Sequence, residues 1–141
     1  MCHNHGRYQA SGAVCLNAMR KQYFFRPSPR GFSAWDVDKL IALTAAYPRR
    51  RVALSEIRDL NEPWFGTGEA ASWVALVEHI KLMDAADLAF PIILAADGTV
   101  MDGMHRAAKA LRAGYTHIEG VQFVVDPHPD FVDVQPTDLP Y

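Results

Sequence analysis

The chain of 141 residues contains only two cysteines, Cys2 and Cys15, and no long apolar run. Two cysteines are too few for a disulfide scaffold or for a complete cysteine zinc site. No stretch approaches the ~20 apolar residues that span a bilayer, and the first residues lack the continuous apolar segment of a signal peptide. We therefore expect a cytoplasmic protein that is not inserted in a membrane.

The common phosphate-binding and hydrolase motifs are also missing. The sequence has no P-loop, no Rossmann glycine fingerprint, no His-Glu-x-x-His motif and no Gly-x-Ser-x-Gly elbow. It has no excess of positive charge either, because its formal net charge is −2 and its pI is about 6.3. Duplex DNA binding requires clustered Lys and Arg, so the charge disfavours a nucleic-acid-binding or nuclease module.

The sequence contains enough hydrophobic residues to form the core of one domain. Half of the residues are hydrophobic (50%), and a chain of this length buries ~65–70% of its unfolded surface. We expect one α+β domain over residues 23–125, a disordered extension over residues 1–22 and a Pro- and Asp-containing tail over residues 126–141. Residues 1–5 hold a thiol and two imidazoles that could reach one metal ion, but the low periodicity there favours disorder, so we assign no metal ligands.

Local patterns predict the elements around the site. A strand is expected at residues 23–25, a stiff proline-rich loop at 26–31, a strand at 52–57 and a last strand at 118–125. A helix is expected from the capping pair Ser33 and Asp36 to about Tyr47, and a second helix after Thr67. Their inward stripes would be Val37, Leu40, Ile41 and Thr44, and Trp73, Leu76, Val77 and Ile80, respectively. His79 is isolated in the sequence and is assigned a structural role.

The most informative segment is residues 102–106, Asp-Gly-Met-His-Arg. Residues 90–95 form a short apolar run, Asp97-Gly98 is a hairpin signal, and residues 99–101 return as a strand. A helix then follows and ends near Gly114, with Met104, Ala107, Ala108 and Leu111 as its buried stripe. On this spacing His105 lies on a different face.

Anions bind at junctions where a strand ends at a glycine and a helix begins directly after it. The first N–H groups of a helix and the positive end of its dipole attract phosphate, and Gly103 would let the phosphate approach the backbone of Gly103, Met104 and His105. His105 is a potential proton carrier, and Arg106 offers a fork of donors suited to phosphate oxygens. Asp102 has three open roles: it orients Arg106, coordinates a Mg²⁺ ion that bridges phosphates, or caps the helix.

This arrangement resembles the core of the ParB/sulfiredoxin superfamily, over roughly residues 51–125. The resemblance implies a small mixed sheet with a hairpin leading into a phosphate-binding helix, and a nucleotide such as ATP, ADP or CTP, with Mg²⁺, as the ligand. Sulfiredoxins place their catalytic cysteine between the Gly and the His, where this chain has Met104. A thioether cannot act as that nucleophile, so sulfiredoxin chemistry is not expected.

The form Asp-Gly-x-x-Arg is closer to small ParB-like proteins, which include ADP-dependent kinases that act on free serine and use an acidic residue after the first strand as a base. The nearest acidic residues are Glu56 and Glu62, and Glu62 is our candidate for that base because it follows the strand and lies in a loop, although it can equally be a solvated loop carboxylate. If the chain is an enzyme, the resemblance implies phosphoryl transfer or nucleotide hydrolysis, with Glu62 and His105 as catalytic residues. A non-catalytic nucleotide sensor or protein-interaction module, including a homodimer, is an equal alternative. Secondary candidates for ligand contact are Arg26, Arg30 and Trp64.

Overall fold

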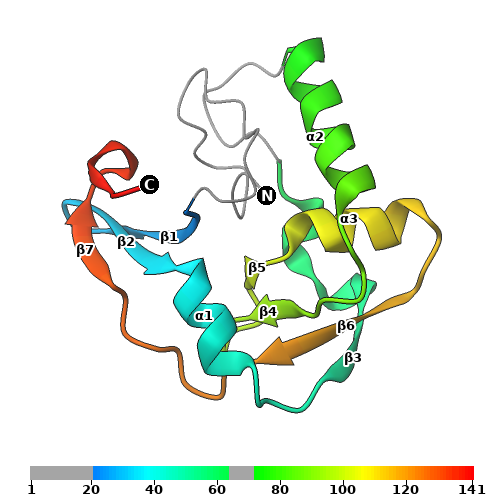
Figure 1. Ribbon diagram of the computed structural model, residues 1–141, viewed down its shortest axis with the longest axis horizontal. Coiled ribbons are helices and arrows are strands. Elements are labelled where there is room, and N and C mark those ends of the chain that lie inside the picture. Colours follow the sequence, from blue (N-terminus) through cyan, green and yellow to red (C-terminus); the bar gives the residue numbers. More distant parts are fainter. Residues whose placement is uncertain (1–20, 64–71) are drawn as a thin grey trace.

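The computed structural model describes residues 21–63 and 72–141, which form a small α+β domain, as the sequence predicts (Figure 1). One sheet has three strands in the order β1-β2-β7, and the other has four in the order β3-β6-β4-β5. A core cluster joins the two sheets: Phe24 and Trp35 of the first sheet, with Leu40 of the helix that follows it, belong to one cluster with Ile93, Met101 and Val121 of the second sheet. The expected N-terminal extension and Trp64 lie outside the described residues, except for residues 21–22.

The first sheet begins with a hairpin of β1 (Tyr23–Ser28) and β2 (Gly31–Asp36). The strands pair without interruption from Tyr23 opposite Asp36 to Ser28 opposite Gly31. The loop expected over residues 26–31 is therefore wrong, and only residues 29–30 turn. Pro27 is tolerated in a strand because β1 is at the edge of its sheet, where proline is accepted.

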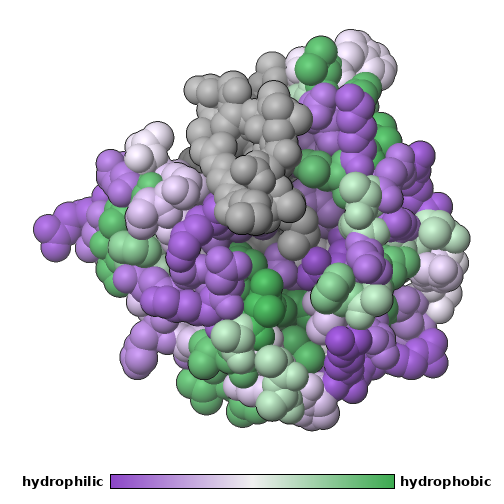
Figure 2. Space-filling model, viewed as in Figure 1, coloured by the Kyte–Doolittle hydropathy of each residue, from purple (hydrophilic) through white to green (hydrophobic). Residues whose placement is uncertain are grey.

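Helix α1 (Val37–Thr44) follows β2 directly, and its N-cap is Asp36, whose carboxylate accepts a hydrogen bond from the Asp38 amide. Val37, Leu40 and Thr44 are buried as expected, but Ile41 is 48% exposed. In Figure 2, hydrophobic residues gather in the lower middle of the face, the region where Figure 1 shows α1. The helix therefore covers the core with a narrower stripe than its sequence suggested.

Helix α2 (Trp73–Ala85) begins at Ser72, whose hydroxyl accepts from the Ala75 amide, whereas the expected cap Thr67 lies outside the described residues. The stripe predicted for this helix is wrong, because Trp73 is 83% and Val77 46% exposed. Among the residues of α2, which the structure describes in full, only His79 is buried. Leu76 and Ile80 of the predicted stripe are partly buried, so the one fully buried side chain of the helix is polar while its apolar residues are buried only in part.

The second sheet contains β3 (Arg50–Ala53), β4 (Ile92–Leu94), β5 (Val100–Asp102) and β6 (His117–Gln122). The chain leaves β3 as two 3₁₀ turns, η1 (Leu54–Glu56) and η2 (Arg58–Asn61), where we expected the strand to continue. The predicted turn at Asp97-Gly98 is confirmed: the Ala95 amide donates to the Thr99 carbonyl oxygen at 2.8 Å, and Gly98 has φ +88°.

Helix α3 (Met104–Arg112) connects β5 to β6, but the parallel partner of β6 is β4. Among the described residues, β5 pairs with β4 alone, in the antiparallel sense, so the parallel crossover that contains α3 links β4 to β6. In the part of the chain that the structure describes, no helix is long and apolar enough to cross a membrane.

The segment expected as a surface tail adds a strand to the domain. Strand β7 (Phe131–Val134) pairs with β2, and the 3₁₀ turn η3 (Pro136–Asp138) follows it. Leu139 packs in a cluster with Tyr23 and Ala34, and the Tyr23 hydroxyl donates to the Pro140 carbonyl oxygen at 2.6 Å.

Candidate functional site

The junction between β5 and α3 is built around Gly103. Its φ of +104° lies in the left-handed region, and a Cβ at this position would stand 2.7 Å from Cγ2 of Ile92 and 2.8 Å from Nη2 of Arg106. Glycine is therefore required here by the backbone conformation and by the close packing of the protein itself. Gly103 is also the N-cap of α3, and no side chain among the described residues caps this helix.

Asp102 and Arg106 form a buried ion pair across the first turn of α3. Nη2 of Arg106 donates to Oδ2 of Asp102 at 3.0 Å and to the Pro91 carbonyl oxygen at 3.1 Å, and the two residues are only 1% and 6% exposed. Asp102 thus orients Arg106, while the helix-capping alternative is wrong. The phosphate-clamping role of Arg106 stays a prediction, and it would require phosphate to displace or loosen Asp102.

The second oxygen of Asp102, Oδ1, is buried and has no hydrogen-bond partner among the described residues. Leaving a carboxylate oxygen unsatisfied in the interior is costly, because it has lost its water without gaining a donor. No three His, Cys, Asp or Glu side chains gather as a metal-binding set within residues 21–63 and 72–141. Coordination of Mg²⁺ by Asp102 therefore stays a prediction.

His105 lies against His79 of α2. Nδ1 of His79 and Nε2 of His105 are 3.2 Å apart, the two rings are stacked at 28°, and each residue is 5% exposed. Burial, helped by the neighbouring His79 and Arg106, lowers the pKa of His105 to about 4, and burial also lowers the pKa of His79. Both rings are therefore uncharged at pH 7, and one N–H bond must point at the other ring's nitrogen.

This contact corrects the stripe predicted for α3. The helix buries His105, Arg106, Ala107 and Ala110, while Leu111 is 53% exposed. His79 was the functional candidate that sequence reasoning missed, because its partner is 26 positions away and no local pattern marks the pair.

A second group of candidates lies at the other end of β5. A cavity of about 280 Å³ is lined by Phe24, Phe25, Arg26, Arg58, Asp59, Glu62, Asp97 and Thr99. The structure thus brings Arg26 and Glu62 together, but it places them apart from residues 102–106. Arg58, which sequence reasoning also missed, lines the same cavity. Arg30 is outside both groups, with an exposed side chain near Asp133.

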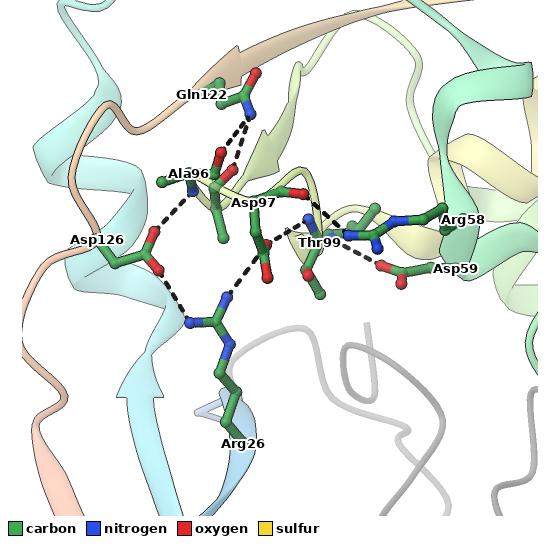
Figure 3. A network of polar contacts seen from close by, with 10 residues as sticks. Arg26, Arg58, Asp59, Ala96, Asp97, Thr99, Gln122 and Asp126 are labelled. Carbon is green, nitrogen blue, oxygen red and sulfur yellow. Dashed lines mark hydrogen bonds and ion pairs between the residues drawn. The ribbon is translucent and has the colours of Figure 1, made fainter.

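Figure 3 shows how the two arginines approach the β4–β5 turn, Arg26 from below and Arg58 from the right of the view. Nη1 of Arg26 donates to Asp126 at 2.9 Å, and Nη2 of Arg58 donates to the Asp97 carbonyl oxygen at 3.0 Å. Asp59 accepts from the Val100 amide at 2.6 Å. Hydrogen bonds from Thr99 hold the pKa of Asp97 below its usual value. This network fixes the turn and leaves Glu62 exposed at the cavity wall.

Comparison of the chain with protein-family models, with curated proteins and with solved structures found no match in any of the three. The resemblance to the ParB/sulfiredoxin superfamily therefore rests on the motif and its neighbouring elements alone.

Proposed function

We propose that the chain binds a phosphorylated small molecule, of the nucleotide class, with a phosphate at the first turn of α3. The observation that carries this proposal is the junction at Gly103, where a strand hands over to a helix that no described side chain caps. The positive end of the helix dipole is then not offset by a capping side chain, which is the arrangement that favours an anion.

The polar groups buried at this turn support the same proposal. Asp102, His105 and Arg106 occupy interior positions where apolar side chains would stabilise the fold without any desolvation cost. Polar residues that break the packing rule in this way are expected at functional positions. In the ligand-free structure the charge of Arg106 is balanced by Asp102, so in the proposed site Arg106 contacts phosphate only when phosphate displaces the Asp102 carboxylate from the ion pair.

The cavity at the turn end of β5 is a second part of the proposed site. From Thr99 to Gly103 a strand advances about 13 Å at ~3.3 Å per residue, which is comparable to the length of a nucleotide. The turn η2 lies beside both parts, since Asp59 bonds to the Val100 amide and η2 contacts α3. In an enzyme of this kind, Glu62 would act as the base from the cavity wall if the acceptor and the transferred phosphoryl group both lay at the cavity, with a different phosphate of the nucleotide at α3.

The direct test is a calorimetric and thermal-shift titration with ATP, ADP, CTP and GTP, each with and without Mg²⁺, and with inorganic phosphate and duplex DNA as further probes. A ligand at a hundred times its Kd should stabilise the protein by about 2.7 kcal/mol. Binding should be lost in the double variant Asp102→Leu/Arg106→Met and kept in Arg30→Ala, a change at an exposed arginine. Binding of DNA without binding of any nucleotide, or no binding at all, overturns the proposal.

Catalysis is tested separately by measuring phosphate release and phosphorylated amino acids in the same samples. Glu62→Gln should abolish product while it leaves nucleotide affinity unchanged, and Glu56→Gln, which is also exposed and close in sequence, is the matched control. If the wild-type protein binds nucleotide but forms no product, the sensor alternative is the correct one.

A further inference from the structure

We propose that His79 is a positioning residue for His105: it accepts a hydrogen bond from Nε2 of His105 and so fixes both the orientation of that ring and the nitrogen that carries its proton. The proposal rests on the proposed function, because it concerns the imidazole at the first turn of α3. It connects α2, which contributes no other buried side chain, to the site.

The contact between the two rings supports this role for His79. The two ring nitrogens approach to 3.2 Å and the ring centroids are 5.4 Å apart, so the nitrogens face each other across the gap. Both rings are buried, and neutral rings at this distance form a hydrogen bond in which one is the donor. A leucine at position 79 would bury apolar surface without this requirement, so the imidazole gives the helix a specific polar partner.

Polar contacts between the C-terminal ends of α2 and α3 hold His79 in place. Nζ of Lys109 donates to the Asp84 and Ala86 carbonyl oxygens at 3.0 and 2.6 Å, and Nη1 of Arg112 reaches the Asp84 carboxylate at 2.6 Å. These contacts fasten the last turn of α2 to the last turns of α3. His79, one to two turns earlier on α2, is therefore held at a fixed distance from the start of α3 rather than on a free helix.

The tautomer preference of imidazole sets the direction of the hydrogen bond between His105 and His79. A neutral imidazole in water carries its proton preferentially on Nε2. Both rings keep this preferred tautomer only when His105 donates from Nε2 to Nδ1 of His79; the opposite direction would force both into the less stable form. Nδ1 of His105 then keeps its lone pair. In this tautomer Nδ1 of His105 can accept a hydrogen bond but cannot donate one to phosphate.

The test begins with the ligand-free full chain, labelled with ¹⁵N in its histidines. The expected spectrum shows one tautomer for His105, with a protonated Nε2 and an unprotonated Nδ1. His79→Leu should convert His105 into a mixture of tautomers. His79→Asn should preserve the single tautomer, because the amide oxygen of Asn can stand where Nδ1 of His79 accepts. His128→Leu, at an exposed histidine, is the control and should change nothing at His105.

The ligand experiment uses ATP with Mg²⁺ on the same variants, each first shown to be folded by circular dichroism. We expect His79→Leu to weaken binding about tenfold, because losing the hydrogen bond between the two rings leaves the His105 ring without a fixed orientation at the first turn of α3, and His79→Asn to stay within about threefold of the wild type. A wild-type His105 that is protonated on Nδ1, a single tautomer in His79→Leu, or equal ATP affinity in His79→Leu each overturns the proposal.

The two proposals fail in distinguishable ways. If the wild type binds no nucleotide, the proposed function is wrong, while the tautomer of the ligand-free protein still decides whether His79 positions His105. If nucleotide binds equally well to the wild type and His79→Leu, the function stands and the positioning role is wrong.

Discussion

The two ends of strand β5 carry the same residue types in opposite environments. At the Gly103 end, the ion pair of Asp102 and Arg106 has side chains only 2% and 7% exposed, at a distance of 3.0 Å. At the Thr99 end, Arg26 and Asp126 approach to 2.9 Å with side chains 30% and 26% exposed. The distances are nearly equal, so any difference in energy must come from solvent.

Water screens the exposed pair and solvates each partner when the pair opens, so its loss costs little. In the interior, water neither screens the pair nor solvates a charge that has lost its partner, because the surrounding medium has a low dielectric constant. The start of α3 should therefore respond sharply to substitution, whereas the turn end of β5 should tolerate change. The predictions below test this contrast, beginning with the largest expected effect.

Removing Arg106 should be the most damaging change. Arg106→Ala leaves the Asp102 carboxylate buried without its partner, which costs about 3–5 kcal/mol in free energy of unfolding. The double variant Asp102→Leu/Arg106→Met replaces both charges and should lie within about 1 kcal/mol of the wild type or be more stable. Urea unfolding measures both. Arg112→Ala, at an exposed pair with Asp84, is the control and should cost at most about 1 kcal/mol. Equal losses in Arg106→Ala and Arg112→Ala would contradict the contrast.

The two glycines that flank β5 sharpen the comparison. Gly98 and Gly103 both have positive φ, at +88° and +104°, but a Cβ at Gly98 meets nothing within 4 Å, while one at Gly103 meets Ile92 at 2.7 Å. Gly98→Ala should cost only the backbone strain, about 1 kcal/mol. Gly103→Ala adds a steric conflict and should cost about 3 kcal/mol. Thermal unfolding of the two variants measures both losses of stability. A smaller loss in Gly103→Ala than in Gly98→Ala would show that the junction can accommodate a Cβ at Gly103.

Around β5, the features that could be predicted from the sequence are those that depend on residues close together in the chain. The turn at Asp97-Gly98 follows from the left-handed preference of glycine, and the end of α3 follows from Gly114, which has φ +84°. The buried face of α3 could not be predicted, because periodicity places His and Arg outside unless their partners are known. Those partners are Asp102, the Pro91 carbonyl and His79, and two of the three are far away in the sequence.

Strand β7 is a second case in which distant contacts decided the structure. Its four residues follow a segment rich in proline, and its partner β2 lies about a hundred positions earlier. The strand is anchored by Asp130, whose carboxylate accepts from the Asp36 amide at 2.8 Å and whose own amide donates to the Ala34 carbonyl oxygen. No pattern within residues 126–141 reveals that pairing.

Acid should destabilise the protein through the histidine pair. The pKa of His105 is about 4 in the folded chain, below its ordinary value of 6.5, so the unfolded chain binds the proton more readily. Stability should therefore be constant above pH 6.5 and should fall between pH 6.5 and 4, by on the order of 3 kcal/mol. Urea midpoints across this range measure the slope, and His79→Asn/His105→Asn should flatten it. The low pKa of Asp97 acts at the other end of β5, where stability is lost only as its carboxylate protonates at lower pH.

The smallest effect is expected at the exposed network. Arg26→Gln removes the ion pairs with Asp126 and Asp97, but both carboxylates remain open to water and keep their backbone donors, the amides of Ala96 and Thr99. The loss should therefore be at most about 1 kcal/mol, and it should shrink further in 1 M salt because the charges are screened. The guanidinium also lies over the rings of Phe24 and Trp35, so Arg26→Lys, which retains the charge but changes this stacking, separates the two contributions. A loss of stability that approaches the loss in Arg106→Ala and does not depend on salt would mean that water is excluded from the turn end of β5 as fully as from the start of α3.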